Sequence, residues 1–161
     1  MFSIVIPLYN KAKSIANTIQ SILGQSFADF ELIIVDDGST DDSVRVVNQF
    51  TDKRIRLIQK ENGGVCSARN VGISNAKYDY IALLDADDYW DKDFLLEASK
   101  LIEDFPQAAL WGINFAEIYE GKLIRELPTG LPKCFRGIVE NYFEMPAKQG
   151  RISDLFCSSS V

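Results

Sequence analysis

Short apolar segments alternate with amphipathic segments through the first hundred residues, and this alternation constrains the fold more than any other feature of the chain. Strands are predicted over residues 2–8, 31–35, 55–58 and 80–84, and helices over residues 14–23, 41–50, 65–76 and 92–105. Strands that alternate with helices pair in parallel through right-handed crossovers, so that helices cover both faces of the sheet. The sequence therefore predicts an α/β fold with a Rossmann-like, mostly parallel central sheet.

The pattern changes after residue 106. A long strand is predicted over residues 109–119, a turn at 120–121, a returning strand over 123–127, a loop over 128–132, a helix over 136–145 and a strand over 152–161. A strand as the last element leaves its neighbours uncovered. The C-terminal part is therefore expected to be mixed and truncated, and its exposed apolar surface is expected to favour self-association.

The composition excludes several classes of protein. The formal charge of −6 argues against a nucleic-acid surface, which needs a basic stripe. The chain has no histidine, and this excludes Ser-His-Asp catalysis, Cys-His catalysis and histidine-ligated zinc. Proton transfer must therefore fall to Asp, Glu, Lys, Tyr or Cys.

The cysteines and the hydropathy pattern bear on the location of the chain. Cys66, Cys134 and Cys157 are odd in number and widely spaced, which fits neither a zinc site nor a disulfide framework. We expect reduced, mostly buried thiols in a cytoplasmic setting. No run approaches the roughly 20 apolar residues of a membrane span, and the N-terminus lacks the pattern of a signal peptide.

Carboxylates follow two of the predicted strands. Asp85, Asp87 and Asp88 come directly after the strand that ends at residue 84, and Asp36 and Asp37 follow the strand that ends at residue 35. Ligands of an open α/β sheet bind beyond the carboxyl ends of its strands, so both groups are expected in one site. Such carboxylates suit a hard cation, Mg²⁺ or Mn²⁺. The alternative is an acidic turn in which one Asp caps the next helix.

These segments together resemble the family-two glycosyltransferases over residues 2–105. The matching segments are Ile4-Val5-Ile6-Pro7-Leu8-Tyr9-Asn10, Gln25-Ser26-Phe27, Phe30-Glu31, Val35-Asp36-Asp37-Gly38-Ser39-Thr40-Asp41, Asn62-Gly63-Gly64, Ala68-Arg69-Asn70 with Gly72, and Asp85-Ala86-Asp87. The last of these looks like the metal-binding D-x-D motif of that family.

The resemblance implies a GT-A fold in a single domain over residues 1–161. Residues 1–105 would form the nucleotide-sugar-binding half, and residues 106–161 a partial acceptor-side half. The implied activity is transfer of a sugar, with inversion and metal assistance, from a nucleotide-diphosphate donor to an acceptor hydroxyl. The metal is Mn²⁺ or Mg²⁺, with Asp87 as the surer ligand and Asp85 as a ribose or metal partner. The implied acceptor is a glycan or lipid-linked saccharide of polysaccharide or cell-envelope biosynthesis, reached from the cytoplasm or the inner face of the membrane through peripheral association.

Physical reasons for a donor contact can be given at two positions. Pro7 is expected to end ladder hydrogen bonding, which would free the following main chain to meet a base edge. Asp37 can accept the imide N–H of uracil or thymine, a donor that cytosine lacks, and this favours a UDP-sugar or a dTDP-sugar. The alternative is that Asp36 or Asp37 caps the next helix or orders the turn through Gly38.

Three further residues are candidates for donor binding, and each also has a purely structural interpretation. Arg69 is expected to reach a phosphate or a carboxylate of the site, or else to form a structural ion pair with Asp36, Asp37 or Asp85. Tyr9 and Trp90 are candidates to stack on the nucleotide or sugar, although packing is the commoner fate of such rings.

The general base is not identified by any motif. Family members carry a Glu-Asp pair after a Gly-Gly-Phe-like segment, and no such motif occurs between residues 105 and 161. Glu117, Glu140, Glu144 and Asp154 lack that context, so we expect the base beyond Val161 and an inactive, donor-binding part of a longer enzyme. A non-catalytic nucleotide-sugar-binding module remains an alternative. A nucleotide-sugar pyrophosphorylase is disfavoured because no glycine-rich loop follows the first strand.

Overall fold

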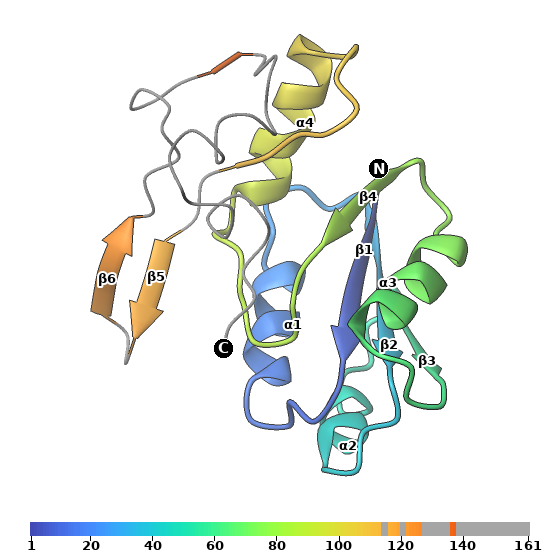
Figure 1. Cartoon of the computed structure of the whole chain (residues 1–161). Coiled ribbons are helices and arrows are strands. Elements are labelled where there is room, and N and C mark those ends of the chain that lie inside the picture. The colour runs from blue at the N-terminus through green and yellow to red at the C-terminus, as the bar shows by residue number, and fades with distance from the viewer. Residues whose placement is uncertain (114–115, 120–121, 127–135, 138–161) are drawn as a thin grey trace, which may run out of the picture. The chain divides into compact units, whose positions relative to one another are not determined.

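A computed structural model describes residues 1–113, 116–119, 122–126 and 136–137 of the chain (Figure 1). The chain divides into two compact units, with the boundary between Leu95 and Leu96.

The first unit is built on a four-stranded parallel sheet. Its strands are β1 (Phe2–Leu8), β2 (Phe30–Asp36), β3 (Ile55–Gln59) and β4 (Tyr80–Leu83), in the order β3-β2-β1-β4. β1 and β2 pair along their whole length, whereas β4 pairs only with the first four residues of β1. Every residue of β2 is buried, as expected for a parallel strand with both faces covered. The prediction of a parallel α/β sheet is confirmed.

Along the chain, the helices of the first unit alternate with its strands. They are α1 (Ile15–Leu23), α2 (Ser43–Val47) and α3 (Val65–Ser74), and α4 (Phe94–Asp104) begins at its end. α3 packs on the sheet through Ala68, against a buried cluster of Val5, Ile33 and Val35, while α1 lies on the opposite side of the sheet (Figure 1). The alternate residues Ile4 and Ile6 are also fully buried, because side chains alternate between the two faces of a strand.

One helix is much shorter than predicted, whereas the other three agree to within two residues at each end. The helix expected over residues 41–50 is limited to Ser43–Val47. At its start, the backbone N–H of Asp41 donates to the side chain of Asn10, and the helix begins at Ser43. At its end, Gln49 and Phe50 donate to carbonyls only three residues back, and such tight bonds close the last turn.

The second unit departs further from the prediction. Its strands are β5 (Ala116–Tyr119) and β6 (Lys122–Glu126), paired antiparallel with an irregularity between Glu117 and Ile118. The long strand expected over residues 109–119 is therefore wrong for residues 109–113, where Leu110 is 71% exposed and the described residues supply no ladder partner.

The remaining C-terminal predictions concern residues that lie largely outside the described part of the chain. Arg136 and Gly137 are not helical, contrary to the helix expected over residues 136–145. The rest of that helix, the turn at 120–121, the loop over 128–132 and the strand over 152–161 lie outside the described residues.

Candidate functional site

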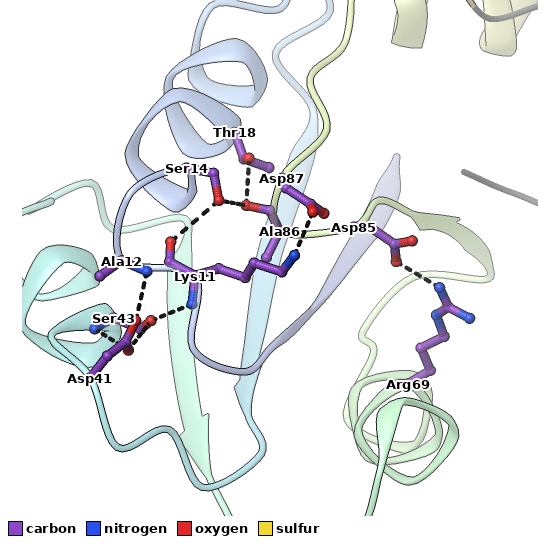
Figure 2. A network of polar contacts seen from close by, with 10 residues as sticks. All are labelled: Lys11, Ala12, Ser14, Thr18, Asp41, Ser43, Arg69, Asp85, Ala86 and Asp87. Carbon is purple, nitrogen blue, oxygen red and sulfur yellow. Dashed lines mark hydrogen bonds and ion pairs between the residues drawn. The ribbon is translucent and has the colours of Figure 1, made fainter. Parts of the chain in front are cut away.

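The carboxyl ends of β1, β2 and β4 meet at one edge of the sheet, because these strands are neighbours and parallel. The segments that follow them therefore lie close together, although they are far apart in the sequence (Figure 2). This arrangement collects Lys11 after β1, the Asp36-Asp37 pair at the end of β2, and Asp85 and Asp87 after β4. The carboxylates of two strand ends thus lie at the same edge of the sheet as the ammonium group of Lys11.

The segment after β4 is anchored to the start of α1. The backbone carbonyl of Ala86 accepts hydrogen bonds of 3.0 Å from the hydroxyls of Ser14 and Thr18. Ala86 itself is buried, so the two carboxylates on either side of it are held by a fixed backbone. The side chains of Asp85 and Asp87 remain 16% and 21% exposed.

Each of these two carboxylates contacts a cation from another element (Figure 2). Oδ2 of Asp87 lies 2.5 Å from Nζ of Lys11, and Oδ1 of Asp85 lies 2.6 Å from Nη2 of Arg69 on α3. Of the alternatives for Arg69, the structure shows the ion pair with Asp85.

Asp37 is buried and holds a turn in place. Its carboxylate accepts hydrogen bonds from Nζ of Lys60 at 2.5 Å, from the amide of Gly63 at 3.0 Å and from the amide of Gly64 at 2.7 Å. Burial raises the pKa of Asp37, but these three donors outweigh it and hold the pKa below the ordinary value. Asp37 therefore orders this turn, and of the roughly four acceptor positions of a carboxylate about one is not used by these donors.

The turn after β2 requires glycine at position 38. Gly38 has a φ of +79°, and a Cβ there would lie 3.0 Å from the backbone nitrogen of Asn62. Asp36 supports the same turn by accepting the amide of Ser39 at 3.1 Å. The ordering role that the sequence left open for these aspartates is therefore present in the structure.

Sequence reasoning missed Asn10, which links the loops after β1 and β2. Its Oδ1 accepts the backbone N–H of Thr40 at 2.8 Å, and its backbone N–H donates to the hydroxyl oxygen of Ser39 at 3.0 Å. Asn10 has a φ of +52°, a conformation that asparagine tolerates better than most residues. An asparagine two residues after the end of a predicted strand was the available signal.

The loop after β1 is also fixed by Ser43 and Asp41. The amide of Lys11 donates to Ser43 Oγ at 2.8 Å, and Asp41 accepts the hydroxyl of Ser43 at 2.5 Å and the amide of Ala12 at 3.1 Å. The hydrogen bond from the Ser43 hydroxyl is the main cause of a lowered pKa at Asp41. This network positions the backbone from which Lys11 extends.

Pro7 ends the ladder on one side of β1 only: the pairing with β4 stops at Val5, whereas the pairing with β2 continues. β1 continues through Leu8, whose carbonyl accepts the amide of Asp37 at 2.8 Å. The carbonyl of Val5 faces β4 and accepts from Leu84, and residues two apart face the same neighbour. The nitrogen of Pro7 therefore points to the β4 side, and without an N–H it cannot donate the next bond to β4, whose pairing with β1 stops at Val5 and Leu83.

Tyr9, Trp90 and Cys66 complete the predicted residues in this unit. Tyr9 is 47% exposed, whereas Trp90 stacks on Phe94 with ring centroids 4.2 Å apart. Cys66 is exposed, which corrects the expectation of buried thiols for this residue, because it lies in the first turn of α3. Cys134 and Cys157 lie outside the described residues.

The donor set at this edge suits a hard cation that arrives with further ligands. Within the described ranges, no three Cys, Asp or Glu side chains are grouped to hold a metal. Asp85 and Asp87 supply two carboxylates, and Mg²⁺ is commonly bound by one or two carboxylates together with substrate phosphates and water. The residues therefore fit a divalent cation only when phosphate or water oxygens complete its shell.

A membrane span is not found either: none of the helices in the described part of the chain has the length and apolarity to cross a bilayer.

Comparison with known proteins gives consistent matches. The family model of Glycosyl transferase family 2 matches residues 3–160. An uncharacterized glycosyltransferase of Rickettsia felis is 44% identical over 133 residues, which cover 80% of this chain and 21% of that protein. Among solved structures, S. aureus TarS 1-349 in complex with UDP-GlcNAc has a TM-score of 0.62 and 33% identity, over 65% of this chain and 32% of that chain.

A second solved structure differs in its nucleotide. The mannosyltransferase PcManGT from Pyrobaculum calidifontis, in complex with GDP-Man and Mn²⁺, has a TM-score of 0.60 and 27% identity over 63% of this chain and 32% of PcManGT. These relatives have GT-A folds, which confirms the predicted fold class. The chain spans about a fifth to a third of the length of these relatives. Since the family model covers nearly all of its residues, the chain belongs to glycosyl transferase family 2.

Proposed function

We propose that the chain is the donor-binding part of a glycosyltransferase that moves a sugar from a nucleotide-diphospho-sugar to an acceptor hydroxyl with inversion. Two ion pairs support this proposal, Asp87 with Lys11 and Asp85 with Arg69. Both lie beyond the carboxyl ends of neighbouring parallel strands. Carboxylates there suit a divalent cation, and the two cations beside them suit a diphosphate.

The divalent cation, Mn²⁺ or Mg²⁺, would be held by Asp87 with Asp85 beside it. When bound, it supplies Lewis-acid stabilisation of the charge that develops on the leaving diphosphate. The chain's own residues bind and orient the donor. Ser14 and Thr18 fix the backbone between the two carboxylates through Ala86.

When the donor binds, Lys11 and Arg69 would each leave a carboxylate and contact a phosphate instead. Each pairs with a carboxylate at no more than 2.6 Å, and each is partly exposed, so its charged end can turn toward a phosphate oxygen. An arginine fork binds phosphate as well as carboxylate, whereas lysine acts as a point charge. The protein therefore holds its carboxylates without repulsion before the donor arrives.

Nucleoside recognition is proposed for Asp37, Pro7 and Tyr9. Asp37 has about one acceptor position left after its three donors, which would suit the imide N–H of uracil. A UDP-sugar is therefore the first candidate and a dTDP-sugar the second. The exposed ring of Tyr9 directly follows β1 and would contact the base or ribose beside the Pro7 backbone.

The acceptor side belongs to the proposal for the whole protein, because this chain spans only about a third of the solved relatives. We propose a glycan or lipid-linked saccharide as the acceptor, which would suit polysaccharide biosynthesis at the inner face of a membrane. The general base is assigned to the protein outside residues 1–161, and residues 106–161 to a partial acceptor side.

Calorimetry with UDP tests the donor site. UDP should bind the chain with Mn²⁺ present and much more weakly in EDTA. Asp87→Asn should abolish the gain from metal, while Asp42→Asn, an exposed carboxylate paired only with Arg45 among the described residues, should bind as the parent does. Equal binding in EDTA would refute metal assistance, and tighter binding of GDP would refute the role of Asp37.

A transfer assay separates the enzyme from the alternative binding module. The chain is given UDP-sugar, Mn²⁺ and a saccharide acceptor, and the release of UDP is followed. Binding without turnover is expected of this chain. The same result from the whole protein would favour a non-catalytic nucleotide-sugar-binding module.

A further inference from the structure

A cavity of about 340 Å³ lies at the opposite edge of the sheet from the carboxylate site. Phe30 and Glu31 begin β2, Arg54 and Arg56 flank the start of β3, and Lys77 precedes β4. Because all four strands are parallel, these amino ends lie a full strand length away from Asp85 and Asp87. The cavity is therefore separate from the proposed donor site.

The cavity is strongly basic although the chain is acidic. Four cations line it, Lys53, Arg54, Arg56 and Lys77, and Glu31 is the single carboxylate among its described lining residues. The whole chain carries a formal charge of −6. A local excess of positive charge in such a chain concentrates anions at that position.

Glu31 builds the floor of this cavity. Its buried carboxylate accepts hydrogen bonds from Ser3 Oγ at 2.7 Å, from the amide of Lys77 at 2.6 Å and from Nη1 of Arg56 at 3.1 Å. Burial raises the pKa of Glu31, but these donors outweigh it and hold the pKa below its ordinary value. Glu31 therefore stays charged and fixes both Arg56 and the backbone that carries Lys77.

Arg54 is fixed independently on the other side. Its guanidinium donates to Asp52 through Nε at 3.1 Å and Nη2 at 2.8 Å, and it lies 4.3 Å from the ring centroid of Phe30. One carboxylate thus balances each arginine. Lys53 and Lys77 form no ion pair among the described residues, although Lys53 helps to lower the pKa of Asp52 and Nζ of Lys77 lies 5.2 Å from the ring centroid of Tyr78. Four cations at this cavity therefore face two carboxylates, Glu31 and Asp52.

We propose that this cavity is a binding site for a phosphate group. Two arginines held in place by a carboxylate each, with two exposed lysines beside them, match an anion with several strong acceptor oxygens. The volume of about 340 Å³ is at the small end of ligand sites and accommodates a phosphate or a hexose phosphate. The phosphate belongs either to a free sugar phosphate or to a lipid headgroup.

Titration of the chain with inorganic phosphate tests the site. Amide shifts of Arg54, Lys77 and Tyr78 are followed by NMR in EDTA, with chloride used to keep the ionic strength constant. We expect saturable shifts, and Lys53→Ala and Lys77→Ala should each weaken binding about threefold to tenfold, as expected for loss of one charged partner. Lys92→Ala removes the same charge from an exposed position elsewhere and should leave binding unchanged.

Two further experiments identify the molecule that carries the phosphate and separate this site from the donor site. Glucose 1-phosphate is compared with vesicles of phosphatidylcholine containing phosphatidic acid, and tighter binding of one of them assigns the phosphate to a sugar or to a lipid. Asp87→Asn should leave phosphate binding intact, which separates this site from the donor site. Unsaturable shifts, or equal losses in Lys92→Ala and Lys77→Ala, would overturn the proposal.

Discussion

Nζ of Lys11 lies 2.5 Å from Oδ2 of Asp87, so an ion pair joins the loop after β1 to the loop after β4. The two residues are 76 positions apart in the sequence. An ammonium group and a divalent cation both require the same carboxylate oxygen. This ion pair therefore sets a competition at the proposed metal ligand.

Replacing Lys11 with methionine should reveal that competition. Without the ammonium group, Asp87 should bind Mn²⁺ several-fold more tightly in the absence of nucleotide, because a pair this exposed is worth about 0.2–1 kcal/mol. UDP should bind more weakly, because a phosphate partner is lost. Manganese binding can be followed by electron paramagnetic resonance, with Lys13→Met as the control. Unchanged Mn²⁺ affinity in Lys11→Met would mean that the ion pair does not compete with metal.

Arg69 should contribute measurably to stability through Asp85. Arg69→Met leaves a carboxylate that is only 16% exposed without this cation, which should cost about 1–3 kcal/mol in the free energy of unfolding. Arg69→Lys keeps the charge and should recover part of the loss. Urea unfolding measures both variants.

The control for Arg69 is Arg45→Met. Arg45 pairs with Asp42 on the surface, with both side chains more than 60% exposed, so its loss should change stability little. Equal losses at Arg45 and Arg69 would contradict a special contribution from the partly buried pair.

The sheet was predictable from the sequence because its strands are short apolar runs that stay buried on both faces. Ile4, Val5 and Ile6 leave no polar face, and this pattern is typical of parallel sheets. The predicted strands of the first unit agree with the structure to within one residue at each end. The strand predicted over residues 109–119 was wrong in part, because an apolar run also needs a ladder partner.

The partners within the site were not predictable in the same way. A lysine after β1 and an aspartate after β4 are visible in the sequence, but their meeting depends on the strand order β2-β1-β4. The same applies to Asp37, which accepts the amides of Gly63 and Gly64. The sequence predicted a turn at these glycines without its carboxylate partner.

Acid should destabilise the first unit below about pH 4. Side-chain hydrogen bonds from Arg54 are the main cause that lowers the pKa of Asp52 to about 2. The pKa values of Glu31 and Asp37 are also lowered. A carboxylate with a lowered folded-state pKa stabilises the fold above its unfolded pKa, near 4, and loses that stabilisation as the pH falls through the folded value.

Urea unfolding between pH 5 and about pH 2 checks this dependence. The free energy of unfolding should fall over the interval from about pH 4 to about pH 2, and Asp52→Asn should make the fall less steep. Asp29→Asn, at an exposed position, makes the same change of charge and serves as the control. A constant free energy of unfolding down to pH 2 would contradict the lowered pKa values.

Gly72 lets α3 approach the sheet. Two effects of opposite sign, helix propensity and overpacking, decide how Gly72→Ala changes the free energy of unfolding. Alanine is favoured over glycine inside a helix by about 1 kcal/mol, so propensity alone predicts stabilisation. A Cβ at Gly72, however, would overlap the side chain of Val5, which is fully buried. Overpacking of this kind typically costs about 1–3 kcal/mol, and we expect Gly72→Ala to destabilise the fold.

A double-mutant cycle with Val5→Ala tests the cause of that loss. Val5→Ala removes the methyl groups that a new Cβ would meet, so the double variant should lose less stability than the sum of the two single variants. Ser74→Ala, at an exposed position on the same helix, controls for helix propensity and should change stability little. Additive losses would show that Gly72 does not act through Val5, and stabilisation by Gly72→Ala would show that α3 moves away from the sheet at little cost.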